Sequence, residues 1–145
     1  MTDRRLAIDA WESLFRAQHE IFGDVNDDFD GILSQGEYDV LLTVTRGDDM
    51  TARLRDVTAN MLISQPSVSR LVDRMVARGL ITKCADPDDG RGSLVKATDA
   101  GSALFRRIAS AHGRAIAERM SLLNDDELAQ LRDLTAKLRK KQPGC

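Results

Sequence analysis

Residues 63–79, ISQPSVSRLVDRMVARG, have the pattern of one amphipathic helix that ends at a glycine. Ser64 is a residue type that often caps a helix N-terminus, and Pro66 fits the first turn, where its missing N–H leaves no helical hydrogen bond unmade. The apolar side chains recur at steps of three and four residues and are Val68, Leu71, Val72 and Met75. This spacing places them on one side of a helix. We therefore predict a helix over residues 65–78, closed by Gly79, with that side facing a core.

The sequence pattern changes directly after this helix. Residues 80–84 (LITKC) and 93–97 (SLVKA) are short β-prone runs, and the ADPDDGRG between them is dense in turn residues. Together they predict a β-hairpin with a long charged tip. Arg91 lies on that tip between two glycines, and we expect Asp89 to pair with Arg91 or a neighbour and so orient the tip. The alternative for this segment is a charged turn that only faces solvent.

Helical periodicity and capping residues predict the remaining elements. The expected helices cover residues 6–22, 35–45, 51–61, 98–120 and 124–138. Ser34 with Glu37, and Asn124 with Glu127, have capping-box spacing, in which each side chain satisfies a backbone N–H of the other residue. The expected order is four helices, a hairpin and two helices. The fold class is therefore mainly α with a small β-hairpin wing.

The composition is typical of a globular chain of one domain, or of one domain with helical arms. Of 145 residues, 42% are hydrophobic and 30% are charged. No apolar run approaches the roughly 18 residues of a membrane span, and residues 1–12 lack the apolar stretch of a secretory signal, so we expect a cytoplasmic protein. The two cysteines, Cys84 and Cys145, do not make a disulfide framework, and we expect Cys84 to be a small buried residue of a strand.

The net charge of −2 hides an uneven distribution along the chain. Residues 1–50 hold four Lys or Arg against twelve Asp or Glu, whereas residues 51–145 hold seventeen against eleven. A uniformly basic nucleic-acid binder is therefore excluded. The middle of the chain can still present a local positive face while an acidic face points elsewhere.

Enzymatic and metal chemistry have little support in the sequence. The chain lacks G-x-S-x-G, a phosphate-binding Walker loop and Cys-x-x-Cys. His19 and His112 are far apart, and neither has a second histidine or cysteine at metal-ligand spacing. We therefore expect no enzyme activity, no catalytic residues, no metal site and no cofactor.

Two short helices followed by a β-hairpin is the order of a winged helix-turn-helix, whose second helix enters the DNA major groove. On the helix that follows Ser64, six polar side chains lie mainly off the apolar stripe and are Gln65, Ser67, Ser69, Arg70, Asp73 and Arg74. Short hydroxyl and amide groups allow close approach to DNA, and the two arginines can reach guanine edges or phosphates. Arg91 on the hairpin can enter a narrow minor groove. The alternative for this helix is a polar face that is only solvated.

SQPSVSRLVDRMVARGLITK, followed by DPDDGRGSLVKATDAG, resembles the recognition helix and wing of MarR-type transcriptional regulators. The resemblance implies a homodimer whose N- and C-terminal helices interlock and whose two winged helices bind a pseudopalindromic operator in double-stranded DNA. It implies three parts: residues 1–33 for dimerisation, 34–98 for DNA binding and 99–145 for dimerisation. By position, the residues matching DNA contacts are Ser64, Gln65, Ser67, Ser69, Arg70, Arg74 and Arg91. Gly90 and Ala85 depart from the family, in which basic residues are common at these places.

The resemblance also implies a repressor that releases DNA when a small molecule binds. Trp11 and Asp39 resemble residues of the urate-responsive branch, with Lys83 as a basic partner, so we expect an anionic or aromatic ligand. The alternative is that Trp11 packs in a dimer core and Asp39 makes a structural salt bridge. Two other functions stay open: a dimeric protein-interaction module whose winged helix no longer binds DNA, and a redox-sensing regulator based on Cys84.

Overall fold

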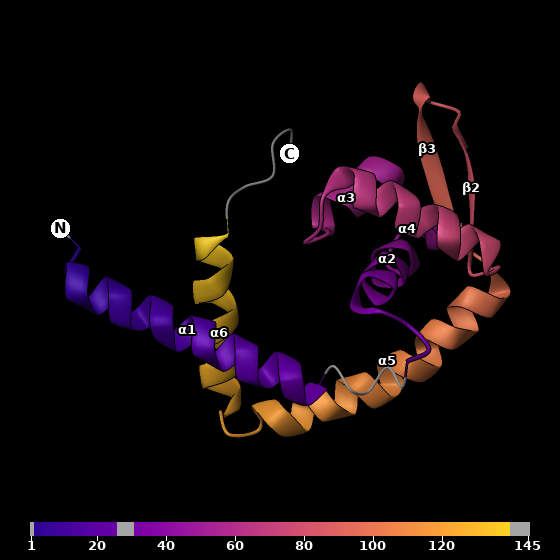
Figure 1. The fold of residues 1–145 in the computed structure, drawn as a ribbon. Helices are drawn as coiled ribbons and strands as arrows, with labels where there is room; N and C mark the ends of the chain where they lie inside the picture. The colour runs from indigo at the N-terminus through magenta and orange to yellow at the C-terminus, as the bar shows by residue number, and fades with distance from the viewer. Residues whose placement is uncertain (1, 26–30, 140–145) are drawn as a thin grey trace. The chain divides into compact units, whose positions relative to one another are not determined.

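The computed structural model describes residues 2–25 and 31–139, which fall into two compact units. One unit holds the described residues between 31 and 110, and the other holds residues 2–25 together with 111–139. The long helix α5 (Asp99–Met120) contributes to both units, because the division falls within it. Figure 1 shows the elements in chain order.

The unit of residues 31–110 is a three-helix domain with a small sheet. Its helices are α2 (Gln35–Thr45), α3 (Leu54–Asn60) and α4 (Gln65–Ala77), joined by the first part of α5. A short 3-10 turn, η2 (Asp48–Met50), leads into strand β1 (Thr51–Arg53), and β2 (Ile81–Asp86) and β3 (Asp89–Ala97) form the hairpin. The sheet is antiparallel in the order β1-β3-β2, so β3 is its central strand.

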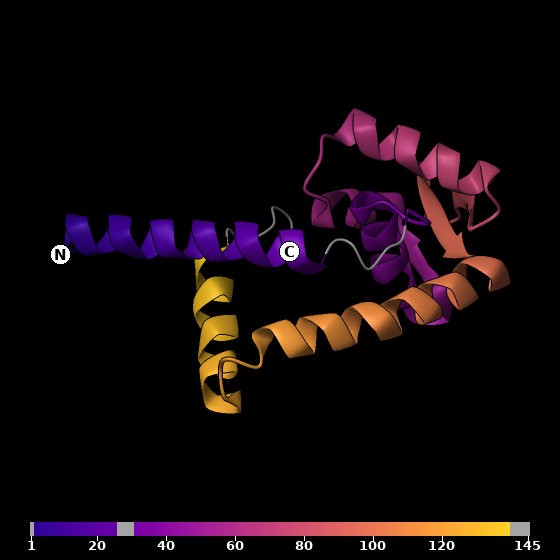
Figure 2. The same cartoon turned by 60° about the horizontal axis from the view of Figure 1, so that its bottom comes forward.

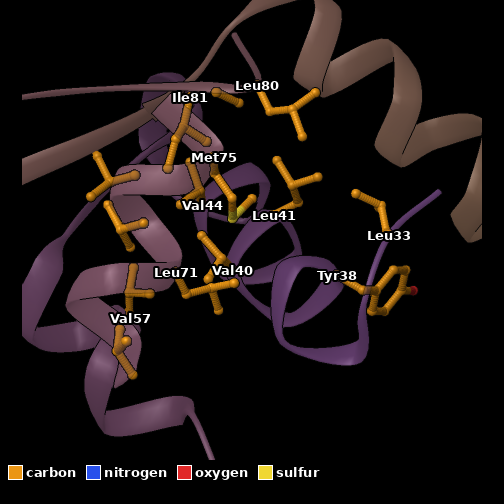
Figure 3. Packing of buried hydrophobic residues seen from close by; sticks show 14 of the residues in the cluster. Leu33, Tyr38, Val40, Leu41, Val44, Val57, Leu71, Met75, Leu80 and Ile81 are labelled. Carbon is orange, nitrogen blue, oxygen red and sulfur yellow. The ribbon is translucent and has the colours of Figure 1, made fainter. Parts of the chain in front are cut away.

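The predicted hydrophobic side of α4 is the centre of this unit's core. Val68, Val72 and Met75 have no exposed surface and Leu71 retains 3%. Figure 3 shows Leu71 and Met75 directed toward side chains of α2, among them Val40, Leu41 and Val44. Each fully buried side chain of this size stabilises the fold by about 1.5–3 kcal/mol. The prediction of an inward stripe on this helix is confirmed.

The ends of the helices follow the capping residues. Ser34 accepts a hydrogen bond from the Glu37 N–H at 3.1 Å, and the Glu37 carboxylate accepts one from the Ser34 N–H at 2.9 Å. The same reciprocal pair joins Asn124 and Glu127 at the start of α6 (Asp125–Leu138). Gly79 ends α4 with φ +75°, a left-handed conformation that glycine adopts without strain. Both predicted capping boxes and the predicted closing glycine are therefore present.

Two expectations about local structure were wrong. The helix predicted over residues 51–61 begins only at Leu54, because Thr51, Ala52 and Arg53 pair with Lys96, Val95 and Leu94 of β3. The hairpin does not have a long tip, since β2 and β3 continue to Asp86 and Asp89 and leave only Pro87 and Asp88 in the turn. Pairing with the distant strand β3 decided the first case, and closer pairing of the neighbouring strands β2 and β3 decided the second.

The other unit contains α1 (Arg4–Val25), the last part of α5 and α6. In both Figure 1 and Figure 2, α1 is one uninterrupted helix. The Arg119 guanidinium of α5 lies 2.9 Å from the Asp24 carboxylate of α1. Within the described part of this unit only Val25 and His112 are buried. Large apolar side chains of the unit remain exposed and include Leu6, Trp11, Phe15, Phe22, Ile116, Leu122, Leu134 and Leu138.

A close backbone contact fixes the start of α5. The Thr98 hydroxyl donates to the Gly79 carbonyl at 2.6 Å and accepts from the Gly101 N–H at 3.0 Å, and the Thr98 N–H donates to the Leu80 carbonyl. A Cβ atom on Gly101 would lie 1.9 Å from the Leu80 carbonyl oxygen. Glycine is therefore required at 101 by the close approach of two backbone segments. The end of α4, the start of β2 and the start of α5 are joined at this point.

We predict that Gly101→Ala lowers the free energy of unfolding by about 2 kcal/mol or more, because the helix must move away from Leu80. The matched control is Gly113→Ala in the same helix, where a Cβ meets nothing within 4 Å. There we expect a gain of about 0.5–1 kcal/mol from the higher helix propensity of alanine. Urea denaturation at equal protein concentration measures both changes. Equal stability of the two variants would contradict the close contact.

Candidate nucleic-acid interface

The outer face of α4 carries the polar residues that the sequence assigned to DNA contact. Ser64, Ser69, Arg70 and Arg74 are exposed, and Ser67 is partly exposed. These side chains come from one helix whose opposite face is buried, so they point away from the core. The structure brings these five predicted residues together. The side chain of Gln65, the sixth residue predicted on this helix, lies outside the described part of the structure.

The serines at the start of α4 bond to each other. Ser64 has the extended backbone of an N-cap residue, but its side chain makes no capping hydrogen bond within the described structure. Its Oγ lies 2.9 Å from the Ser67 Oγ instead. The two hydroxyls thus form a small polar cluster at the helix start, beside the backbone N–H groups that a helix leaves without an intrahelical partner. Such N–H groups are suited to bind an anionic oxygen.

The one acidic side chain on the outer face of α4 has a cation beside it. Asp73 lies 3.7 Å from the ammonium group of Lys83 on β2. This pair connects the helix to the hairpin and offsets a negative charge between Arg70 and Arg74. A shallow depression of about 370 Å³ lies next to the helix and is lined by Ser34, Gly36, Ile63, Ser67, Arg70, Leu71 and Arg74.

Arg91 lies on a bulge of β3 and not at the turn, where the sequence placed it. Ala85 pairs with Ser93, but the next residue, Asp86, pairs with Asp89. Gly90, Arg91 and Gly92 are the three residues of β3 between these partners, so they form the bulge. A bulge bends its strand and changes the direction of a side chain. The expected Asp89 contact is present, but it reaches the backbone: the Asp89 carboxylate accepts the Arg91 N–H at 3.1 Å.

The acidic residues of the hairpin do not all face solvent. The Asp86 side chain is 4% exposed and lies 3.1 Å from the Arg53 guanidinium of β1, whereas the Asp88 side chain is 81% exposed. Arg53, Arg55, Ser69, Asp86 and Arg91 all line a groove of about 530 Å³ between α3, α4 and the hairpin. Sequence reasoning missed Arg53 and Arg55. No local pattern marked Arg53, since it belongs to a three-residue strand that forms only against β3.

The residues predicted for a ligand lie in different units. Trp11 is 60% exposed on α1, with its ring centroid 5.7 Å from that of Phe15. Asp39, in the other unit, accepts a hydrogen bond from the Gln35 side chain at 3.0 Å. Lys83, also in that unit, pairs with Asp73. The structure therefore gives each residue its own local contacts, and the effector site stays a prediction.

The expectation that Cys84 is buried was wrong. It lies in β2 as predicted, but its side chain is exposed. Only the two ends of β2, Ile81 and Asp86, are buried, and the four residues between them, Cys84 included, are exposed. A β-prone context indicates a strand, but it does not say which face a residue occupies.

Residues 2–25 and 31–139 contain no cluster of three or more His, Cys, Asp or Glu that could hold a metal ion. Over the same residues, no helix is both long and apolar enough to cross a membrane.

Comparisons with known proteins agree with this architecture. Residues 30–92 match the model of the MarR family. The multiple antibiotic resistance protein MarR of Escherichia coli (strain K12) is 32% identical over 73 residues, which cover 50% of this chain and 51% of MarR. A MarR-family transcriptional regulator of Rhodococcus sp. RHA1 is 25% identical, with a TM-score of 0.80 over 94% of this chain and 96% of that one.

A further structural neighbour was solved with DNA. It is Sco3205, a MarR family transcriptional regulator of Streptomyces coelicolor, which is 18% identical with a TM-score of 0.83 over 95% of this chain and 88% of that one. The expected fold class, mainly helical with a small β wing, is confirmed by these likenesses and by the structure. Proteins of this family are transcription regulators and not enzymes. Residues 30–92 are therefore similar to the MarR family of transcriptional regulators, and the chain shares the fold of the MarR-family structures.

Proposed function

We propose that the chain is a homodimeric DNA-binding repressor that a small anionic or aromatic ligand releases from its operator. The observation that carries the proposal is the division of α4 into a buried apolar face and an exposed face of serines and arginines, next to a hairpin that presents Arg91. The DNA complex of its structural neighbour Sco3205 supports this interpretation. Double-stranded DNA is the proposed partner, with α4 in the major groove and the hairpin along the flanking minor groove.

The charges on α4 suit this role. Arg70 and Arg74 are four residues apart, so they project from the same part of the helix surface. An arginine in the major groove can bind the O6 and N7 atoms of guanine, or a phosphate. Asp73 lies between these two arginines in the sequence. Because it pairs with Lys83, it repels phosphate less than a free carboxylate would. Ser64, Gln65, Ser67 and Ser69 are the proposed short contacts to phosphates and base edges.

Dimerisation accounts for the exposed apolar residues of the unit made by residues 2–25 and 111–139. Trp11 and Phe15 of α1 and Leu138 of α6 are each more than half exposed in a single chain. The polar faces of these helices are mixed in charge, which fits a partner helix better than a membrane surface. We propose that the flanking segments, residues 1–33 and 99–145, dimerise, while residues 34–98 bind DNA. Two recognition helices then lie about 34 Å apart, one turn of DNA.

We expect the protein to bind a fragment that carries its own gene's upstream region, with two chains per site and an affinity that falls steeply with salt. Arg70→Ala with Arg74→Ala should weaken binding at least about 10-fold and flatten the salt dependence, because base and phosphate contacts are lost. The control is Arg107→Ala, which removes one exposed arginine of α5. Fluorescence anisotropy over a salt series measures all three. Unchanged binding by the double variant would reject α4 as the reading helix.

The hairpin offers a gain-of-function test. A Cβ on Gly90 meets nothing within 4 Å, so a long side chain fits there without displacing its neighbours. We expect Gly90→Arg to tighten DNA binding and to steepen the plot of log affinity against log salt by about 1, the value for one added phosphate contact. Ala103→Arg, on the exposed surface of α5, adds the same charge elsewhere. Equal effects of the two variants would mean that only net charge matters.

The ligand is tested through Trp11, the single tryptophan of the chain. We expect urate, salicylate or a small polycarboxylate to change its fluorescence, raise the midpoint of thermal unfolding and release DNA. Trp11→Phe, Asp39→Asn and Lys83→Met should weaken release without weakening DNA binding to the same degree. Absence of any response to these three classes of compound would reject the proposed effector, while leaving the DNA-binding proposal intact.

One further candidate function has support in the structure. The exposed Cys84 thiol on β2 can be reached by an oxidant, as a redox-sensing regulator requires. In that case peroxide would release DNA from the wild type, and Cys84→Ser would prevent the release. The protein-interaction alternative predicts no specific binding by the wild type to any fragment of the upstream region.

A further inference from the structure

Asp86 stands out because it is the only buried acidic residue in the described part of the chain. A carboxylate inside a protein is costly unless a cation and hydrogen-bond donors compensate for the lost water. Both of its oxygens have such partners: Oδ2 lies 3.1 Å from Nε of Arg53, and Oδ1 accepts the Asp88 N–H at 2.9 Å. One carboxylate therefore binds β1 on one side and the hairpin turn on the other.

The pair spans the sheet. The strand order is β1-β3-β2, so Arg53 on β1 and Asp86 on β2 are separated by the central strand. Arg53 pairs with Leu94 of β3, which in turn pairs with Cys84 of β2, two residues before Asp86. The Arg53 side chain consequently crosses β3 and reaches toward the turn. Arg53 is also the residue that precedes α3, so the contact joins the hairpin to the helix-turn-helix itself.

The hairpin irregularity that carries Arg91 begins at the same place. The register shifts between Ala85 and Asp86, and the bulge follows from Gly90 to Gly92. Within it, Asp89 accepts the Arg91 N–H, and its carboxylate lies within 3.5 Å of a Cβ placed on Gly92. The Asp86 and Asp89 carboxylates thus hold the turn and the bulge. Asp86 also joins the turn to β1 through Arg53, which lies 4.0 Å from the exposed Asp88 as well. Arg53, Asp86, Asp89 and Arg91 line one groove.

We propose that Arg53 is a positioning residue for Arg91: by holding Asp86 across β3, it fixes the turn and bulge that aim Arg91 at DNA. The inference rests on the proposed DNA-binding function and adds to it a residue outside the recognition helix and the hairpin. Arg53 acts through Asp86. Removing its guanidinium leaves a buried carboxylate without its cation, and that carboxylate regains water by moving the turn outward.

A double-mutant cycle tests the proposal on the full-length protein, with the upstream fragment as probe. Arg91→Ala and Arg53→Met should each weaken binding, by about 10-fold for loss of one groove-inserted arginine. The variant that carries both should bind no more weakly than Arg91→Ala alone, since a mispositioned Arg91 and an absent one are equivalent. Additive losses would overturn the proposal, because Arg53 would then act independently of Arg91.

Footprinting gives a readout that a general loss of stability would not produce. In Arg53→Met, hydroxyl-radical protection of the minor groove flanking each half-site should be lost, while protection of major-groove guanines from methylation remains. Loss of both protections in parallel would overturn the proposal. Lys96→Met is the matched control, because it removes another cation of the same sheet, paired with Asp49 at 3.1 Å. It should leave the minor-groove footprint unchanged.

If Arg53→Met fails to fold, Arg53→Met with Asp86→Leu removes both charges and tests the same point. This pair should fold and still lose the minor-groove footprint, whereas a normal footprint would overturn the proposal. Arg53→Lys keeps the charge and should restore part of the affinity. If the proposed DNA-binding function were wrong, the result would differ from all of these. The wild type would not bind specifically, or Arg70→Ala with Arg74→Ala would bind as well as the wild type.

Discussion

The burial of one side of α4 is the constraint on which the unit of residues 31–110 depends. Val68, Leu71, Val72 and Met75 fill the space against α2, and the remaining elements of the unit complete that core. A helix anchored along one side cannot rotate, so the direction of its outer side chains is set by the packing of its inner ones. The same four apolar residues that stabilise the domain therefore determine that Ser67, Ser69, Arg70 and Arg74 are presented outward. Stability and recognition are coupled through the rotation of a single helix.

The contacts of the hairpin aspartates decide how much of their negative charge a phosphate near Arg91 would meet. Three aspartates near Arg91 would repel a phosphate backbone if all faced it. Asp86 instead is buried against Arg53. Asp89 is exposed but accepts the backbone N–H of Arg91, and the exposed Asp88 lies 4.0 Å from Arg53. Two of the three negative charges are thus used to shape the turn and bulge. A hairpin with three aspartates can still present its one arginine when two of those aspartates, Asp86 and Asp89, are engaged by Arg53 and by the backbone of the bulge.

The sequence was most informative where structure is local. The stripe of α4, the capping residues Ser34 and Asn124, and the closing Gly79 are encoded within a few neighbouring residues, and each was predicted. Strand β1, the bulge at Arg91 and the Arg53–Asp86 pair depend on β3 lying between β1 and β2, and no short pattern contains that information. The prediction that Cys84 is buried failed for a similar reason, because the packing of other elements decides which residues of a strand are covered. The outward polar residues of α4 were therefore accessible to sequence reasoning, whereas the contacts that support the hairpin were not.

The acidic N-terminal third argues less against DNA binding than its net charge suggests. Glu37 caps α2 and pairs with Arg78 at the end of α4, Asp49 pairs with Lys96 of β3, and Asp24 pairs with Arg119 of α5. Each of these carboxylates has a cation beside it, so its field at a distance is reduced, and surface pairs of this kind are further screened by salt. The field that a phosphate meets near α4 is set by the nearest charges, Arg70, Arg74 and the Lys83–Asp73 pair. Charge position relative to the recognition helix, and not charge summed along the chain, is the quantity that bears on binding DNA.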